Sequence, residues 1–577
     1  MTKRVLLVHP TFPTTYWGFQ ESLAIIKTKA SLPPLGLVTL AAYLPPSWDL
    51  RLVDLNIDAL ENRDLRWADV ILMGGMLIQL KSMHEVISRA HSLDRPVVVG
   101  GPAPTTSPEA FGDADLIVQG EIEGQVDTLR EALDSLMSPR NPLQSKNAGD
   151  RQRGSARILA APKQHPSMSS ARVPRFDLLK IHDYTSLSIQ YSRGCPFHCE
   201  FCDIVEIFGH RPRVKSDDQV LAEIATLHRL GYTGSIFFVD DNFIGNKRTV
   251  QRLLPKLASW QRAHGRPFDF YTEASVNLAA DERLMLQMID AGFRSVFVGI
   301  ETPSTEALTQ AGKSQNLGID LNEAIATLTR TGLEVMGGFI VGFDTDTAAI
   351  FEMQRAFIQR NPIPLAMVGL LIALPETALS RRLEGEGRLR GPTSGDQFGR
   401  PNFEPAMDER TLLVGYRKLM VDLYSPEAYY DRCEAYVRQA GPLPIGGDEG
   451  ATDIAAFLRI AYHVGLRSPR RRLFWRLLHH ARRAAPHVLK WAVVHALQGE
   501  HMIRYTQEHL LPRLDAAIRV IDAERVAASR ALAPSPTDAD AEATSGRRWV
   551  NVLRPPSASP AATPKVGHLG EILPHPA

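Results

Sequence analysis

Short runs of Val, Ile and Leu recur along this chain, and segments with helical periodicity separate them. Nearly continuous apolar runs of this kind are typical of parallel strands that helices cover on both faces. In the first 137 residues they lie at 5–8, 50–54, 70–75, 96–101 and 116–121. They predict an α/β fold that begins with a doubly wound sheet over residues 1–137. Ligands of such sheets bind beyond the carboxyl ends of the strands.

The strand and helix alternation returns in residues 173–400, after a segment, 138–172, that is rich in Ser, Pro, Gln and Arg and predicts a linker. Six successive units favour a partial parallel (β/α)6 barrel over a second open sheet, although periodicity alone leaves both open. Residues 401–530 have helical spacing and predict an α-helical C-terminal domain. Residues 531–577 lack an apolar period and predict a disordered tail. The six barrel strands are expected at 186–191, 235–239, 268–273, 295–300, 335–341 and 366–372.

Composition narrows the partners and the compartment. The chain has 577 residues, enough for several domains, with 65 basic and 64 acidic side chains and a net charge of +1. Nothing in this balance indicates a nucleic-acid partner. The N-terminus lacks the apolar run of a signal peptide, and no stretch is long enough to span a membrane. With four cysteines, the chain is expected to be cytoplasmic, where thiols stay reduced.

Three of the four cysteines, Cys195, Cys199 and Cys202, lie within eight residues, directly after an expected strand. Three thiolates at C-x3-C-x2-C spacing suit an iron–sulfur cluster whose fourth iron keeps an open coordination position. A structural zinc site needs a fourth ligand, and Cys433 is far away in the sequence, so zinc is the weaker interpretation. Three buried, inert thiols are the remaining alternative. The spacing predicts a metal centre that binds a further ligand.

This cysteine motif resembles that of the radical S-adenosylmethionine (SAM) enzymes, and Phe201, directly before the last cysteine, fits the same family. The resemblance implies a [4Fe-4S] cluster whose open iron binds the amino and carboxylate groups of SAM. It also implies that Phe201 lies beside SAM.

Carboxylates follow several of the expected barrel strands. Asp240 and Asp241 end the second strand, where they could hold the sulfonium or amino group of SAM or could cap the next helix. Glu273 and Glu301 end the next two strands and could accept hydrogen bonds from ribose or an amino group, or form ordinary salt bridges. The context Gly-Ile-Glu-Thr at Glu301 resembles a SAM-binding motif of the family. The resemblance also implies main-chain contacts to adenine near Gly342.

Together with the first domain, the barrel resembles the cobalamin-dependent radical SAM enzymes, in which a cobalamin-binding doubly wound domain precedes the radical domain. The segment Ser-Leu-Pro-Pro-Leu-Gly-Leu at 31–37, and the segments 100–102 and 120–123, carry this likeness. The Asp-x-His-x-x-Gly segment that supplies a histidine to cobalt in many cobalamin proteins is absent, and His9 is expected to form a loop hydrogen bond instead. Residues expected near cobalamin are Gly100, Gly101, Gly120 and Glu121.

The resemblance implies methyl transfer to an unactivated carbon, fed by a reductant protein such as flavodoxin or ferredoxin. Relatives with a helical appendage methylate large apolar molecules, either hopanoid lipids or bacteriochlorophyll rings, and either class remains open here. Two alternatives remain as well. The chain could oxidise, cyclise or rearrange its substrate without transferring methyl, or it could be a non-catalytic cobalamin or iron–sulfur sensor.

Two further segments raise questions that the sequence leaves open. Residues 467–483 hold seven arginines and no acid, with Leu, Phe and Trp between them. Such a basic amphipathic helix can lie on the inner face of an anionic membrane, or it can pack on its own protein. After the sixth strand, Glu376 stands where relatives have glycine, which changes the backbone freedom expected beside the substrate mouth.

Overall fold

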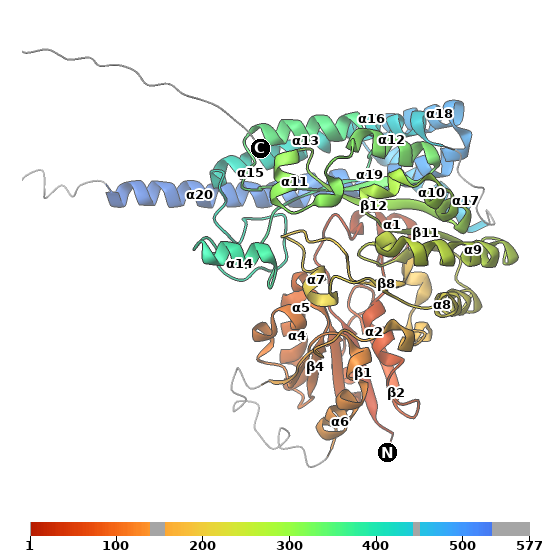
Figure 1. Cartoon of the computed structure of the whole chain (residues 1–577), viewed down its shortest axis with the longest axis vertical. Helices are drawn as coiled ribbons and strands as arrows, with labels where there is room; N and C mark the ends of the chain where they lie inside the picture. The colour runs from red at the N-terminus through yellow and green to blue at the C-terminus, as the bar shows by residue number, and fades with distance from the viewer. Residues whose placement is uncertain (1, 139–155, 442–450, 533–577) are drawn as a thin grey trace, which may run out of the picture. The chain divides into compact units, whose positions relative to one another are not determined.

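The computed structural model describes residues 2–138, 156–441 and 451–532 (Figure 1). About half of the predicted linker, residues 139–155, and all but the first two residues of the predicted tail, 533–577, lie outside these ranges. Residues 1–521 form one compact unit, and residues 522–577 belong to a second. None of the helices within the described ranges has the length and apolar character needed to cross a membrane.

The first domain is a six-stranded parallel sheet in the order β2-β1-β3-β4-β5-β6. Its apolar runs alternate between two buried faces, because Leu6 and Val8 pack with α4 whereas Val5 and Val70 pack with α6. The doubly wound architecture is therefore confirmed. The elements are β1 Arg4–His9, α1 Gln20–Ile26, α2 Leu35–Ala41, β2 Asp49–Asp54, α3 Asn62–Trp67, β3 Val70–Gly74, α4 Leu80–His91, β4 Val97–Gly100, α5 Pro102–Thr106, β5 Leu116–Val118 and α6 Val126–Leu136.

The predicted linker contains the sixth strand of this sheet. β6, Arg157–Leu159, pairs with β5 in parallel register, with Ile158 opposite Ile117. Part of the segment 138–172 therefore belongs to the sheet of the first domain. A three-residue edge strand inside a polar stretch leaves no periodic signal in the sequence, and only the neighbouring strand defines it.

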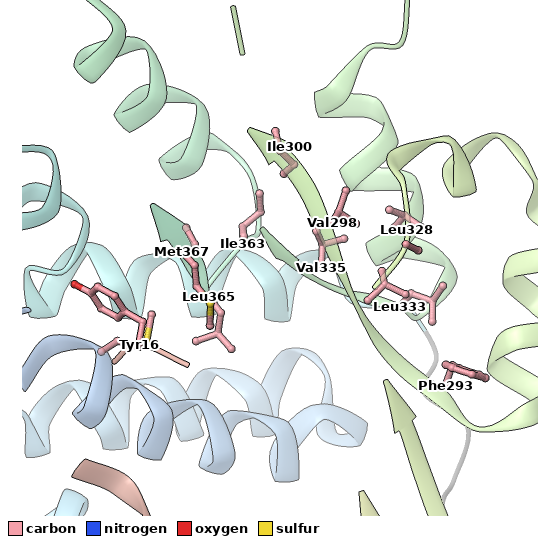
Figure 2. Packing of buried hydrophobic residues seen from close by; sticks show 14 of the residues in the cluster. Tyr16, Phe293, Val298, Ile300, Leu328, Leu333, Val335, Ile363, Leu365 and Met367 are labelled. Atoms are coloured by element: carbon pink, nitrogen blue, oxygen red, sulfur yellow. The ribbon is translucent and has the colours of Figure 1, made fainter. Parts of the chain in front are cut away.

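The second domain is a parallel sheet whose strands follow sequence order, β14-β13-β12-β11-β10-β7, as expected for a partial barrel. Alternate residues of β12 face opposite sides, so that Val298 and Ile300 pack with α12 and β13 side chains such as Leu328 and Val335 (Figure 2). The elements are β7 Ser186–Ile189, β8 Ser192–Arg193, α7 Ile204–Phe208, β9 Arg213–Val214, α8 Asp217–Arg229, β10 Gly234–Phe238, α9 Lys247–Ala263, β11 Phe268–Glu273, α10 Glu282–Ala291, β12 Phe293–Glu301, α11 Thr305–Gln310, α12 Leu321–Thr331, β13 Glu334–Val341, α13 Ala349–Arg360 and β14 Ala366–Leu370.

A helical region follows the barrel, as predicted. Fully buried Arg432 attaches it to the barrel edge, since its guanidinium donates to the carbonyl oxygens of Ile363 and Leu423. Tyr16, from the loop after β1, stacks on Tyr424 of this region (Figure 2 shows Tyr16). The loop after β1 is therefore fixed by the helical region. The helices are α14 Ala378–Gly385, α15 Glu409–Leu423, α16 Pro426–Gln439, α17 Ala451–Tyr462, α18 Arg471–Ala484, α19 Leu489–Tyr505 and α20 Leu511–Leu532.

Candidate active site

The three clustered cysteines lie in the loop between β8 and α7, at the carboxyl end of the barrel strands. All three are partly exposed and form no disulfide. Backbone hydrogen bonds fix both ends of the loop: the Cys195 amide donates to the Gly209 carbonyl at 3.2 Å, and the Glu200 amide donates to the Ala311 carbonyl at 2.9 Å. Gly312 has φ +66°, and a Cβ there would lie 2.7 Å from the His198 carbonyl oxygen. The loop therefore holds its thiols in a defined position before any metal binds.

Side chains from the segment after α11 surround these thiols with hydrogen-bond donors and positive charge. Gln315 Nε2 lies 3.6 Å from Cys199 Sγ, and the buried Lys313 ammonium lies 5.9 Å from the centre of the Phe201 ring. Burial raises the pKa of the Cys195 and Cys202 thiols. Buried thiols of this kind stay protonated unless a cation stabilises the thiolates, and metal coordination supplies that cation. The donor set fits the predicted iron–sulfur cluster.

Lys313 is a site residue that sequence reasoning missed. Its Nζ donates to Glu301 Oε1 at 2.6 Å, and both side chains are buried. Burial opposes its protonation, but the negative charges of Glu301 and Cys199 raise its pKa above the ordinary value. Gly299 makes room for the pair, because a Cβ at that position would lie 2.8 Å from Nζ. The structure therefore keeps a cation next to the cysteine loop.

Glu301 itself has a strained backbone at the end of β12. Its φ is +63°, a conformation that costs a non-glycine residue of the order of 1–3 kcal/mol. The strand is irregular here, since the register with β13 shifts between Gly299 and Glu301. Asn316 Nδ2 donates to the carbonyl oxygens of Gly299 and Ile300 at 3.0 Å and supports this shape. Strain that the surroundings hold in place is typical of ligand sites.

The carboxylate of Asp240 is occupied by the protein backbone. It is fully buried and accepts hydrogen bonds from the amides of Tyr191 and Ser192, with 3.0 Å to the Tyr191 nitrogen. Burial raises the pKa of Asp240 to about 6, against these hydrogen bonds. These contacts fix the start of the cysteine loop. These hydrogen bonds do not test the predicted direct contact between Asp240 and SAM.

Asp241 and Glu273 lack protein cations as partners. Asp241 Oδ2 is buried without a hydrogen bond from any described residue, and Glu273 has neither a hydrogen bond nor an ion pair within the same ranges. Burial, and then the charge of Asp240, raise the pKa of Asp241 to about 7. Burial, and then the charge of Asp241, raise the pKa of Glu273 to about 8. Two partly buried carboxyl groups beside the cysteine loop, without an ion pair among the described residues, fit a cationic ligand such as SAM.

Phe201 lies within the cysteine loop, and Gly342 directly follows β13. The Phe201 ring is 6.1 Å from the ring of Phe343, directly after β13. Gly342 has φ +105°, and its amide donates to Asp346 at 2.9 Å, so a side chain here would strain the backbone. These positions allow the predicted contacts with SAM, which remain predictions.

The first sheet presents glycines at its carboxyl edge. Gly74 of β3 lies opposite Gly100 of β4, and a Cβ on Gly101 would lie 3.4 Å from the Gly75 backbone. Gly101 and Gly120 have φ values of +96° and +75°. A backbone edge without side chains allows close approach of a large ligand, which fits the predicted cobalamin.

Glu121, in contrast, points its carboxylate at arginines of the second domain. Arg193, two residues before Cys195, donates to Glu121 at 2.7 Å and to Glu123 at 2.9 and 3.0 Å. Arg213 donates twice more to Glu121, at 2.7 and 3.0 Å. Both glutamate side chains are almost fully buried. These ion pairs, called the Arg193 clasp below, join the cobalamin-type domain to the cysteine loop, so the Glu121 side chain is committed there. Its predicted contact with cobalamin is not tested.

Three family models match the chain. The B12 binding domain matches residues 21–130, the radical SAM superfamily matches residues 189–355, and a domain of unknown function, DUF4070, matches residues 377–511. The first two coincide with the glycine edge and with the cysteine-bearing barrel. The predicted cofactor set of an iron–sulfur cluster, SAM and cobalamin is thereby confirmed for the family, while the individual contact residues stay predictions.

Known proteins show the same arrangement over nearly the whole chain. An uncharacterized methyltransferase of Synechocystis is 36% identical over 519 residues, covering 87% of this chain and 92% of its own. The hopanoid C-2 methylase of Rhodopseudomonas palustris is 33% identical, covering 88% and 94%. The structure of the radical SAM methyltransferase TsrM from Kitasatospora setae, with cobalamin and a [4Fe-4S] cluster bound, shares the fold with a TM-score of 0.55 at 16% identity, over 84% of this chain and all of that one. The chain is thus an enzyme that belongs to the cobalamin-dependent radical S-adenosylmethionine family, among methyltransferase relatives.

Proposed function

We propose that this enzyme transfers a methyl group to an unactivated carbon of a large apolar, polycyclic substrate. The observation that carries the proposal is the joint presence of a three-cysteine loop, two unpaired buried carboxyl groups and a glycine edge on an adjoining domain. The hopanoid C-2 methylase relative supports an apolar acceptor.

The bound cofactors supply an electron for cleaving SAM and a cobalt atom that carries methyl. The protein's own part is binding and orientation. Cys195, Cys199 and Cys202 hold the cluster, while the carboxyl groups of Asp241 and Glu273 bind the cationic end of SAM. The Lys313 ammonium neutralises the nearby thiolates and the SAM carboxylate.

An aromatic inner face of the barrel supports the apolar substrate. Phe237 of β10 stacks on Tyr271 of β11, with ring centres 4.7 Å apart. Phe297 of β12 meets Trp17, from the loop after β1, at 5.1 Å. The three strand residues are only partly buried, unlike their strand neighbours that face the helices, and Trp17 is 46% exposed. Partly exposed aromatic rings on one face suit a flat or ring-shaped hydrocarbon and exclude water from the reacting carbon.

The test is an anaerobic reaction of the reconstituted enzyme with SAM, a flavodoxin or ferredoxin reducing system, and a lipid extract as the substrate source. We expect deoxyadenosine together with a lipid that has gained the mass of one methylene. Deoxyadenosine without this gain would instead support oxidation, cyclisation or rearrangement. No deoxyadenosine would favour a sensor. The triple Cys195→Ala, Cys199→Ala, Cys202→Ala variant is the matched control and should lose the iron absorbance.

A second experiment separates the role of Lys313. Lys313→Met should weaken SAM binding and shift the visible absorbance of the cluster, because it removes a cation next to two cluster thiolates. Lys313→Arg should restore binding in part by keeping the charge. If Met and Arg behave alike, the charge of Lys313 has no part in SAM binding.

A further inference from the structure

A ridge of exposed apolar side chains runs along α17 and onto α18. It comprises Ile454, Phe457, Leu458, Tyr462, Leu466 and Trp475, and is called the apolar ridge below. Ile454, Leu458 and Leu466 are each more than 60% exposed. Spacings of three, four and eight residues place the α17 members on one helix face. The opposite face is occupied, since Ile460 and Val464 are buried and α17 packs on α1 and α19.

The basic helix α18 cannot insert its own apolar face into a membrane. The apolar face of α18, formed by Phe474, Leu477 and Leu478, is buried, and the helix packs on α16 and α19. This answers the question left open by the arginine-rich stretch: its apolar residues pack on the protein. Trp475 points elsewhere, because its indole nitrogen donates to the Gly465 carbonyl at 2.9 Å, next to Leu466. The exposed apolar surface therefore centres on α17.

The stretch of chain that carries the apolar ridge, from Ile454 to Trp475, contains basic but no acidic residues. Between Asp453 and Glu500 the sequence contains no acidic residue. Arg470 and Arg476 are paired with glutamates from other helices. The remaining exposed arginines of residues 467–483 form no ion pair with any residue of the described ranges; they are Arg467, Arg471, Arg472, Arg482 and Arg483. An apolar strip bordered by unpaired arginines is complementary to a surface that is apolar within and anionic at its rim.

We propose that the apolar ridge inserts into the surface of an anionic lipid bilayer, with the unpaired arginines on the phosphate headgroups. An interfacial helix of this kind buries its apolar face at the boundary of headgroup and acyl chain and gains from attraction to anionic lipid. Each arginine near such a surface strengthens binding by about fivefold at moderate salt. A protein partner would need an acidic rim of matching shape, whereas a bilayer needs only negative charge.

The ridge is linked to the barrel through α1. This helix packs on α17 and begins three residues after Trp17, the side chain that contacts Phe297 on the inner face of β12. If the proposed function holds, this link would place the barrel next to the membrane from which it takes an apolar substrate. Lipid binding itself is measured without turnover, so its failure and the failure of methyl transfer are distinguishable.

Flotation of the full chain with vesicles tests the proposal. Vesicles of phosphatidylcholine with about one third phosphatidylglycerol should carry the wild-type chain to the top of the gradient at moderate salt. Leu458→Glu and Leu466→Glu should each lower binding by at least about tenfold, since each removes an inserted side chain and adds repulsion. Arg471→Gln with Arg472→Gln should lower it by about fivefold per arginine and weaken its salt dependence.

Leu286→Glu on α10 is the matched control, because Leu286 is 52% exposed and lies outside the ridge. It should bind like wild type, and circular dichroism should show all variants folded. The proposal is overturned if the chain ignores anionic vesicles, or if Leu286→Glu weakens binding as much as Leu458→Glu. It is equally overturned if the lipid-free chain is a dimer that Leu458→Glu separates, since a second copy would then cover the ridge.

Discussion

Two sets of carboxyl groups with little exposure lie near the cysteine loop, and their surroundings differ. In the Arg193 clasp, Glu121 and Glu123 receive arginine donors on nearly every oxygen. Burial alone would raise the pKa of Glu123, but the charge and hydrogen bonds of Arg193 lower it. Asp241 and Glu273 are buried beside the same loop without such partners, and their pKa values are raised to about 7 and about 8.

The difference distinguishes a carboxylate that stabilises the fold from one that is available to bind a ligand. A buried charge that the protein satisfies stabilises one arrangement of two domains. A buried carboxyl group that the protein leaves unsatisfied costs stability, and a cationic ligand removes that cost when it binds. Removing the partner of the first set should therefore damage the fold, whereas altering the second set should damage binding and spare the fold.

The largest effect is expected from Arg193→Met. It leaves Glu121 with fewer donors and Glu123 without its bidentate partner, and breaking a buried ion pair costs about 3–5 kcal/mol. Urea unfolding followed by circular dichroism measures the loss. Arg330→Met is the control, because the Arg330–Glu323 pair is more than half exposed and should contribute little to stability. Equal losses in the two variants would contradict the assignment of a structural clasp.

Glu273→Gln should show the opposite behaviour. The free energy of unfolding should stay unchanged or rise at neutral pH, because a neutral amide replaces a costly buried acid. SAM affinity, measured by equilibrium dialysis with the reconstituted enzyme, should fall by about tenfold or more, the contribution of one charge-assisted contact. Asp269→Asn, on the same strand but paired with Arg294, should leave SAM affinity unaltered. Unchanged affinity in Glu273→Gln would remove Glu273 from the SAM site.

The pH dependence of stability sharpens the same comparison. The folded-state pKa of Glu273, about 8, lies above its unfolded value near 4.5, so the folded SAM-free chain binds the extra proton between these values. The glutamate's contribution is thus most favourable below pH 4.5 and is lost as pH rises toward 8, by at most about 1.4 kcal/mol per pH unit. Glu273→Gln should gain stability relative to wild type between pH 5 and pH 8 in urea titrations. A constant difference would mean that Glu273 is ionised throughout.

The sequence anticipated the parts of this fold that local patterns encode. The apolar strand runs predicted both sheets, because a strand buried on both faces needs continuous Val, Ile and Leu. The cysteine spacing predicted an iron–sulfur centre of the kind that the family binds, since all three candidate ligands lie in one loop. The strand β6 was missed, because three residues at a sheet edge carry no period of their own.

The roles that escaped prediction depend on residues far apart in the chain. Arg193 donates to Glu121 across 72 positions, and no local pattern reveals this ion pair, while the contact of Glu121 with cobalamin stays a prediction. Lys313 lies 12 positions after Glu301 and belongs to no recognisable motif. The sequence also does not reveal that Asp240 accepts hydrogen bonds from the amides of Tyr191 and Ser192, 49 and 48 positions earlier, while its contact with SAM stays a prediction. Tertiary pairing of charges leaves no trace in local periodicity.

The smallest effect concerns Glu376, the residue that departs from the glycine of relatives. Its φ of +63° confirms that the backbone keeps the left-handed shape although a side chain is present. Such a conformation costs a non-glycine residue about 1 kcal/mol, so Glu376→Gly should raise the free energy of unfolding by up to that amount, offset in part by the greater freedom of glycine in the unfolded chain. Glu376→Ala is the matched comparison, since it keeps the strain and removes only the carboxylate. If Ala and Gly stabilise equally, charge repulsion explains the gain. If only Gly does so, relief of the backbone strain at Glu376 explains the gain.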